Sequence, residues 1–183
     1  IKGEALNVIS QPLLFPPFVK PETPIRDPSS IFLQSMKILS IRDFATIDDD
    51  RKYLNTVNGL TTYYGYTLNM LKALSSDKPE KYFLAARNME AAYNAISGIP
   101  DLEPLARRAL SHKMYYEGID NLISLNFREA CNLFEEAEHE LANALAKAEK
   151  NIELIIISTA LKLELALTNS ILNLTKSLSL YNR

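Results

Sequence analysis

The spacing of apolar residues is the feature that most constrains how this chain folds. Within residues 48–75, apolar side chains from Leu54 to Leu71 recur at intervals of three, four and seven positions. That spacing places them along one face of an α-helix, and similar spacing recurs in the later segments. No window shows the strict alternation of apolar and polar residues that marks a half-buried strand. The sequence therefore predicts an all-α fold.

Residues that start and stop helices divide this pattern into about six predicted helices. Prolines and glycines supply several boundaries, because proline fits the first turn of a helix and glycine commonly follows its end. Asp101 is the predicted N-cap of the fourth helix, and Asn151 is the only candidate hinge between the last two. The predicted helices lie near residues 29–41, 48–75, 79–97, 101–125, 127–150 and 152–179.

Residues 1–28 differ from the rest because they contain six of the nine prolines. Each proline fixes its own φ angle and keeps the preceding residue out of the helical conformation, which predicts an extended arm. Its apolar residues, Phe15 and Phe18 among them, would be costly to leave in water. We expect the arm to pack on its own domain, with packing on a partner as the alternative. The chain thus divides into an arm at 1–28 and a single all-α domain at 29–183.

Composition argues against several classes of function. Lys and Arg total 20 against 22 Asp and Glu, a net charge of -2 that provides only a weak field for a polyanion. We therefore expect no nucleic-acid partner. Cys131 is the only cysteine, which fits an intracellular and most simply cytoplasmic location. Three charged residues interrupt the apolar stretch at 152–167, so we expect no membrane span.

The most distinctive local pattern lies within residues 114–141. Gly118 and Ala130 are small enough to let two antiparallel helices approach closely, while Phe134 fills the gap beside the pair. With Ala137, these residues stand at the spacing at which tetratricopeptide units place glycine, alanine, an aromatic residue and alanine. The segment therefore resembles a tetratricopeptide unit. The resemblance implies a stack of antiparallel helical hairpins that binds a partner helix or extended segment in a groove.

A weaker, partial repeat of this unit precedes it in the sequence. Ala85, Met89 and Ala92 repeat the spacing of the second helix of the unit, and Gly65 could play the part of Gly118. This earlier hairpin would be longer, since Gly65 is further from Ala85 than Gly118 is from the matching alanine. We therefore expect an irregular repeat.

A second resemblance covers the order of elements before that repeat. An arm with the sequence LLFPPF precedes a helix with Ile41 to Ala45 and then Leu60 to Tyr64, followed by the hairpins. This order is similar to that of Bro1 domains, which bind amphipathic helices of membrane-remodelling filament proteins. The similarity again implies recognition of a helix.

Candidates for catalysis are few because the chain has two histidines and one cysteine. Arg107, four residues and His112 form a spacing that resembles the ribonuclease motif of the all-helical HEPN domains. In that family the arginine contacts phosphate and the histidine supports attack by the ribose hydroxyl. The alternative is that both residues lie on an exposed helix face. We expect no enzyme activity and keep the ribonuclease as the enzymatic alternative.

Metal chemistry has one weak candidate. Glu136 and His139 have the i, i+3 spacing by which ferritin-like helices bind iron. That chemistry needs a second such pair, but Ala109 stands where a glutamate would have to precede His112. We therefore expect neither a metal site nor a cofactor, and we interpret the nearby glutamates as a solvated helix face.

Adjacent tyrosines are the candidate partner-binding residues of the helical domain. Neighbouring rings point in different directions around a helix, so they do not all face the core. Exposed tyrosines suit recognition because they bury a large area and keep a hydroxyl for hydrogen bonding. The alternative is that each group straddles the core boundary. The candidates, with the two phenylalanines of the arm, are Tyr63, Tyr64, Tyr66, Tyr115, Tyr116, Phe15 and Phe18.

The segment at 152–180 has more apolar residues than one buried stripe requires. Its main stripe is predicted to include Leu163 and Leu167, read with Ile155, Ile156 and Ile171. Other apolar residues, Ile157, Leu161 and Leu165, lie off that stripe. The segment is therefore a central helix, a self-association surface or a face presented to a partner.

These observations favour a protein-interaction or scaffold module. The expected partner is another protein, which includes a second copy bound through residues 152–180. The alternatives are a HEPN-like ribonuclease that uses Arg107 and His112, and a structural subunit of a larger assembly.

Overall fold

Helices account for all the regular structure of the described residues. The computed structural model describes residues 48–150 and 155–181, and in these ranges it contains five α-helices, one 3₁₀ helix and no strand. The all-α prediction is confirmed there. The arm with Phe15 and Phe18 and the helix predicted near 29–41 lie outside the described residues. The helices are α3 Asp48–Leu74, α4 Lys81–Ile96, η2 Pro100–Leu102, α5 Glu103–Ile123, α6 Phe127–Ala148 and α7 Ile155–Tyr181.

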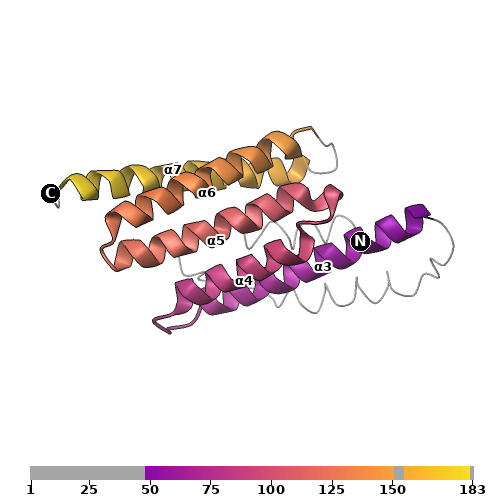
Figure 1. Ribbon diagram of the computed structural model, residues 1–183, viewed down its shortest axis with the longest axis horizontal. Coiled ribbons are helices and arrows are strands. Elements are labelled where there is room, and N and C mark those ends of the chain that lie inside the picture. The colour runs from indigo at the N-terminus through magenta and orange to yellow at the C-terminus, as the bar shows by residue number, and fades with distance from the viewer. Residues whose placement is uncertain (1–47, 151–154, 182–183) are drawn as a thin grey trace.

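The α-helices lie in a row in which each packs mainly against the next one along the chain (Figure 1). Successive helices run in opposite directions, from indigo α3 at one end to yellow α7 at the other. The last two predicted helices, near 127–150 and 152–179, are present as separate helices, since α6 ends at Ala148 and α7 returns alongside it. The predicted hinge, Asn151, lies outside the described residues. Helix α7 is therefore an outer element of the row.

A left-handed residue closes the turn between α5 and α6. Leu125 has a φ of 61°, and its amide donates to the Leu122 carbonyl at 3.1 Å. The amide of Asn126 donates to the Asn121 carbonyl at 2.9 Å. Together these bonds form a Schellman motif, which satisfies the last carbonyls of a helix. The motif ends α5 abruptly and allows α6 to return along it.

Gly118 of α5 lies directly beneath the ring of Phe134 of α6. A Cβ atom at Gly118 would lie 2.7 Å from Phe134 Cε1, closer than packed atoms approach. Phe134 is fully buried, and its ring centroid is 5.6 Å from that of Tyr115. The expected close approach of these two helices is therefore present. Phe134 fills space inside this hairpin, at the glycine itself.

The earlier hairpin uses a different glycine from the expected one. Gly65 is exposed, and a Cβ atom there would meet nothing within 4 Å, so it does not play the part of Gly118. Gly59 does so instead, because a Cβ atom there would lie 2.6 Å from both Ile99 Cδ1 and Leu102 Cδ1. Gly59 thus seats α3 against the link between α4 and α5.

The predicted N-cap of the fourth helix is also wrong. Asp101 lies inside η2, while the residue before α5 is Leu102, which makes no side-chain capping bond. The Asp101 carboxylate instead lies 3.3 Å from the Lys52 ammonium of α3. Proline at position 100 favours the tight 3₁₀ turn, which shifts Asp101 out of the capping position.

The rotation of α7 is the largest departure from the sequence interpretation. Ile157 and Leu161, which were placed off the main stripe, are buried, whereas Leu163 is exposed. Of the predicted main stripe, Leu163 therefore points outward, while Leu167 and Ile171 are half-buried. Among the described residues, no helix is long and apolar enough to cross a bilayer.

The glycine contacts yield a stability prediction. We expect Gly118→Ala to lower the free energy of unfolding by about 1–3 kcal/mol, because its methyl group displaces the buried ring of Phe134. Gly65→Ala is the matched control, and we expect it to raise stability by up to about 1 kcal/mol through helix propensity alone. Urea denaturation measures both. Equal effects of the two substitutions would contradict the assigned packing.

Candidate functional site

A buried ion pair joins α5 to α7. The Arg108 side chain is fully buried, and its Nε donates to Glu164 Oε2 at 2.9 Å. A second guanidinium nitrogen of Arg108 donates to Glu164 Oε1, so the pair is bidentate. Bidentate pairs have a fixed geometry because the planar guanidinium matches the carboxylate. This contact therefore sets both the position of α7 and its rotation about its own axis.

The same guanidinium also reaches α3. Its remaining nitrogen, Nη1, donates to the Tyr63 hydroxyl at 3.4 Å. Tyr63 is 1% exposed, and burial raises the pKa of its hydroxyl, so the group stays neutral. Arg108 thus connects three helices that are not consecutive in the chain. It is also the largest of the fully buried side chains among the described residues.

His112 completes this cluster one turn further along α5. Its Nε2 lies 3.1 Å from Glu164 Oε2, so Glu164 faces two α5 side chains. Burial alone would raise the pKa of Glu164, but the charges of Arg108 and His112 lower it to about 2. The His112 Nδ1 is buried and has no hydrogen-bond partner among the described residues. Because Arg108, Tyr63 and Glu164 are buried and His112 is only 13% exposed, the cluster mainly holds helices together.

The inner face of α7 is unusually polar around Glu164. Thr168 and Thr175 are buried, and each hydroxyl donates to the carbonyl four residues earlier, at 2.9 and 2.8 Å. These local bonds satisfy the hydroxyls without any partner from α6. Apolar residues, Ile157, Leu161 and Leu172, fill the rest of the face. The buried face of α7 thus mixes polar and apolar residues, while Leu163, Leu174 and Leu178 are exposed.

The outer face of α7 carries the strongest candidate for a binding surface. Leu163, Leu174 and Leu178 are 40%, 56% and 38% exposed, and Leu167 is half-buried. With 3.6 residues per turn, these four leucines fall within an arc of about 60° on the helix. We call them the leucine stripe. Single exposed leucines are ordinary, so it is their alignment that makes this row a candidate binding surface.

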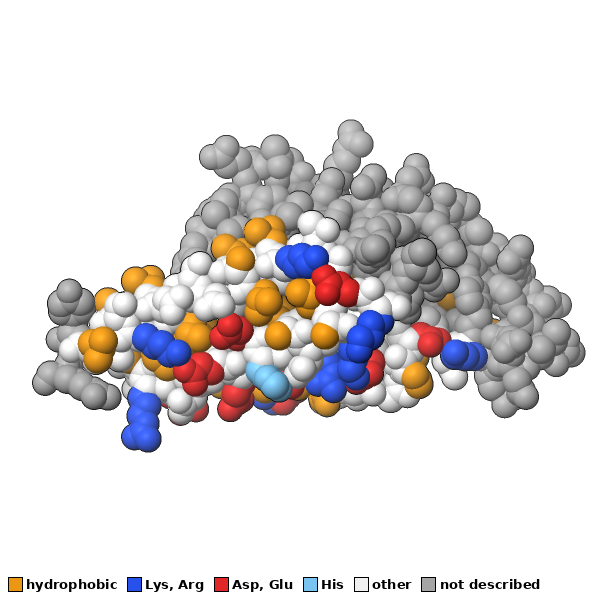
Figure 2. Space-filling model, turned by 90° about the horizontal axis from the view of Figure 1, so that it is seen from above, with side chains coloured by type: hydrophobic (Ala, Val, Ile, Leu, Met, Phe, Trp, Pro, Cys, Tyr) orange, Lys and Arg blue, Asp and Glu red, His pale blue; other side chains and the backbone are white. Residues whose placement is uncertain are grey.

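No charged residue of α7 lies within the leucine stripe. Lys162 extends toward α6, where its Nζ lies 2.7 Å from Glu149 Oε1. Lys176 does the same with Glu135 Oε1, also at 2.7 Å. The third charged residue of this helix, Glu164, is buried. Viewed from the side of α6 and α7, apolar side chains lie between separated charged ones (Figure 2). The stripe is therefore uncharged, and the two lysines of this helix lie on another side of it.

The tyrosine candidates divide between core and boundary. Tyr63, Tyr115 and Tyr116 are buried, whereas Tyr64 and Tyr66 are half-buried. The rings of Tyr63 and Tyr64 form an edge-to-face pair with centroids 5.1 Å apart. The interpretation in which a group straddles the core boundary describes the group of Tyr63, Tyr64 and Tyr66, whereas Tyr115 and Tyr116 both lie in the core. A partner-binding role stays a prediction and now concerns Tyr64 and Tyr66.

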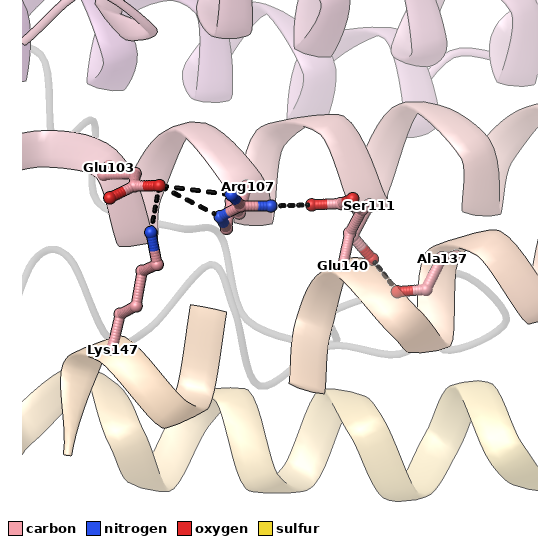
Figure 3. Close-up of polar contacts among 6 residues, drawn as sticks. All are labelled: Glu103, Arg107, Ser111, Ala137, Glu140 and Lys147. Carbon is pink, nitrogen blue, oxygen red and sulfur yellow. Dashed lines mark hydrogen bonds and ion pairs between the residues drawn. The ribbon is translucent and has the colours of Figure 1, made fainter. Parts of the chain in front are cut away.

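Arg107 belongs to a surface network between α5 and α6 (Figure 3). Its Nη1 donates to Glu140 Oε2 at 2.9 Å, and its Nε donates to Glu103 Oε1 at 3.3 Å. Lys147 of α6 also donates to Glu103, and this hydrogen bond lowers the pKa of the Glu103 carboxyl. Below the network, the buried Ser111 hydroxyl donates to the Ala137 carbonyl at 2.8 Å. These contacts fasten the two helices of the hairpin.

The residues of the ribonuclease hypothesis have separate partners. Arg107 faces glutamates of α5 and α6, whereas His112 faces Glu164 of α7. A phosphate-binding arginine and a catalytic histidine would have to converge on one substrate. Their contacts do not show such a convergence, and the ribonuclease stays a hypothesis.

A hollow of about 480 Å³ lies on the surface of α5 and α6. It contains the pair considered for metal binding, Glu136 and His139. Within the ranges that the structure describes, no group of three His, Cys, Asp or Glu side chains could hold a metal ion. The hollow is lined by Met114, Asn132, Glu135, Glu136, His139 and Glu140.

Comparison with known proteins gives no match: no family model, curated protein or solved structure is similar to this chain. The resemblances to tetratricopeptide units, Bro1 domains and HEPN domains therefore stay predictions. Contacts, burial and charge within the chain itself are the basis for its functional assignment.

Sequence patterns did not reveal the pair of Arg108 with Glu164 or the outward position of Leu174 and Leu178. One signal was present in the sequence. Glu164 interrupts a strongly apolar segment, and Thr168 and Thr175 continue a polar row at helical spacing. A polar row inside an apolar helix indicates that a buried charged partner determines which face is inside.

A double-mutant cycle tests the buried pair. We expect Arg108→Met or Glu164→Leu alone to lower the free energy of unfolding by about 3–5 kcal/mol, because each leaves a buried charge without its partner. We expect the loss of unfolding free energy in the double variant to be at least about 1 kcal/mol smaller than the sum of the two single losses. Arg107→Met is the neighbouring control, with an expected cost below about 1 kcal/mol for a solvent-screened pair. Additive single effects, measured by urea unfolding, would contradict the contact.

Proposed function

We propose that this chain is a protein-interaction module that binds a partner helix along the leucine stripe of α7. The observation that carries this proposal is the orientation of α7. Its buried face contains Glu164, Thr168 and Thr175, whereas its exposed face contains leucines. Burying a leucine side chain contributes about 1.5–3 kcal/mol, so an aligned row favours a covered state. A straight apolar row on a helix is the surface that a second amphipathic helix fits.

The hairpin row supplies a rigid support for such a surface. We interpret it as a tetratricopeptide-like stack, supported by the close contact of Gly118 with Phe134 and by the antiparallel order of the helices. In such stacks each repeat contacts mainly its neighbours, and an exposed terminal helix needs a polar outer face for solubility. The exposed face of α7 carries polar residues, among them Asn169, Asn173 and Ser177, but the leucine stripe beside them is apolar. This exposed apolar row favours a binding role for that side of the helix.

The alternative functions receive less support from the contacts. The ribonuclease hypothesis requires Arg107 and His112 to act together, and they face different helices. A structural subunit of a larger assembly would use the same leucine stripe as an interaction module. It differs in one property, because the isolated chain would then aggregate without its assembly.

Site-specific photo-crosslinking tests the proposed surface. A benzoylphenylalanine at position 174 should crosslink a helix of a partner in an extract of the native source. The control carries it at Phe83 of α4, which is 54% exposed and lies away from α7. Leu163→Lys should lower the yield at 174 about tenfold or more, because it places a charge within the buried row. Identical products at 174 and 83, or none at 174, would overturn the proposal.

A further inference from the structure

The leucine stripe has a spacing that is the same in both chain directions. Its members lie at 163, 167, 174 and 178, with intervals of four, seven and four residues. Reversing the helix about the midpoint between Ser170 and Ile171 exchanges Leu163 with Leu178 and Leu167 with Leu174. In an antiparallel pair with its two-fold axis at this midpoint, each of these leucines would face a leucine of the second copy.

From this symmetry we infer that the partner on the leucine stripe is a second copy of the chain, bound through an antiparallel pair of α7 helices. The inference rests on the proposed function and names its partner. The stripe spans about 22 Å of helix axis, enough for four leucines of each copy to interdigitate. An antiparallel arrangement also aligns the two helix dipoles favourably.

Packing at the centre favours the antiparallel arrangement over a parallel one. Ser170 lies about 20° beyond the edge of the stripe's arc, and its hydroxyl donates to the Ala166 carbonyl at 2.8 Å, so it needs no partner across an interface. In the antiparallel pair Ser170 faces the half-buried Ile171 of the other copy, which sets a small residue against a large one. A parallel pair would set serine against serine and leave a gap.

Charge argues for a second copy over a lipid surface. Binding to anionic membranes relies on lysines and arginines beside the apolar face. The two lysines of α7 are paired with Glu149 and Glu135 of α6, and the stripe itself is uncharged. Two such neutral faces can meet without repulsion. Because one helix pair is a small interface, we expect a reversible dimer.

Sedimentation of the full chain measures the dimer. We expect the fraction of dimer to rise with protein concentration up to about 100 μM. That concentration exceeds the micromolar dissociation constants of modest interfaces. Leu174→Lys should weaken it about a hundredfold or more, since the symmetric interface loses the leucine twice. Ile123→Lys, at an exposed apolar position of α5, should leave it unchanged. Circular dichroism of each variant shows whether the helices remain folded.

Disulfide trapping tests the antiparallel arrangement in a Cys131→Ala background. Ser170→Cys lies near the two-fold axis and should form a crosslinked dimer under mild oxidation, because two cysteines bridge only when their Cα atoms are within about 7 Å. Leu163→Cys alone should not crosslink, but its mixture with Leu178→Cys should. Asn173→Cys, exposed beside the stripe, is the negative control. Crosslinking of Leu163→Cys with itself would overturn the antiparallel arrangement.

Other outcomes separate this inference from the proposed function. A monomeric chain with no Ser170→Cys dimer overturns the inference, while capture of a different protein by the probe at 174 would leave the proposed function standing. Liposome binding by a monomer, or a monomer that unfolds when Leu174 is replaced by lysine, also overturns the inference. The first result would assign the stripe to lipid and the second to the chain's own residues.

Discussion

The buried pair of Arg108 with Glu164 is the contact on which the outer half of the structure depends. A helix as apolar as α7 can bury more than one face, and hydrophobicity alone does not choose between them. A buried carboxylate has no such freedom, since the fold loses several kcal/mol of stability unless that carboxylate pairs with a positive charge. Arg108 provides that charge at one place only, so α7 turns toward it.

That choice of face connects the interior to the surface. Once Glu164 points inward, Thr168 and Thr175 follow it into the interior, and Leu163 and Leu174 turn outward. The cost of burying polar groups is limited because the hydroxyls bond to their own helix. The cost of exposing leucines remains until something covers them. The exposure of the leucine stripe, which we propose as an interaction surface, is thus a consequence of the interior ion pair.

Sequence patterns predicted the parts of the fold that depend on local spacing. Helix-terminating residues predict the helix ends near Leu74 and Ile123. The small size of Gly118 predicts the close approach of two helices there. The rotation of α7 was not predictable in this way, because it depends on Arg108, 56 positions before Glu164. Gly59 was missed for the same reason, since its neighbours Ile99 and Leu102 come from a distant link. Such contacts leave no periodic signal.

The pKa of the Glu164 carboxyl group is the most direct test of the buried pair of Arg108 with Glu164. Carbon-detected NMR of labelled protein, compared with Glu164→Gln for assignment, follows its titration. Because the folded pKa lies near 2 and the ordinary value is 4.5, the pair stabilises the fold above about pH 4.5 and loses that effect as the pH falls toward 2. The account predicts a pKa near 2. A pKa near 4.5 or above would contradict the buried pair and the orientation of α7 that follows from it.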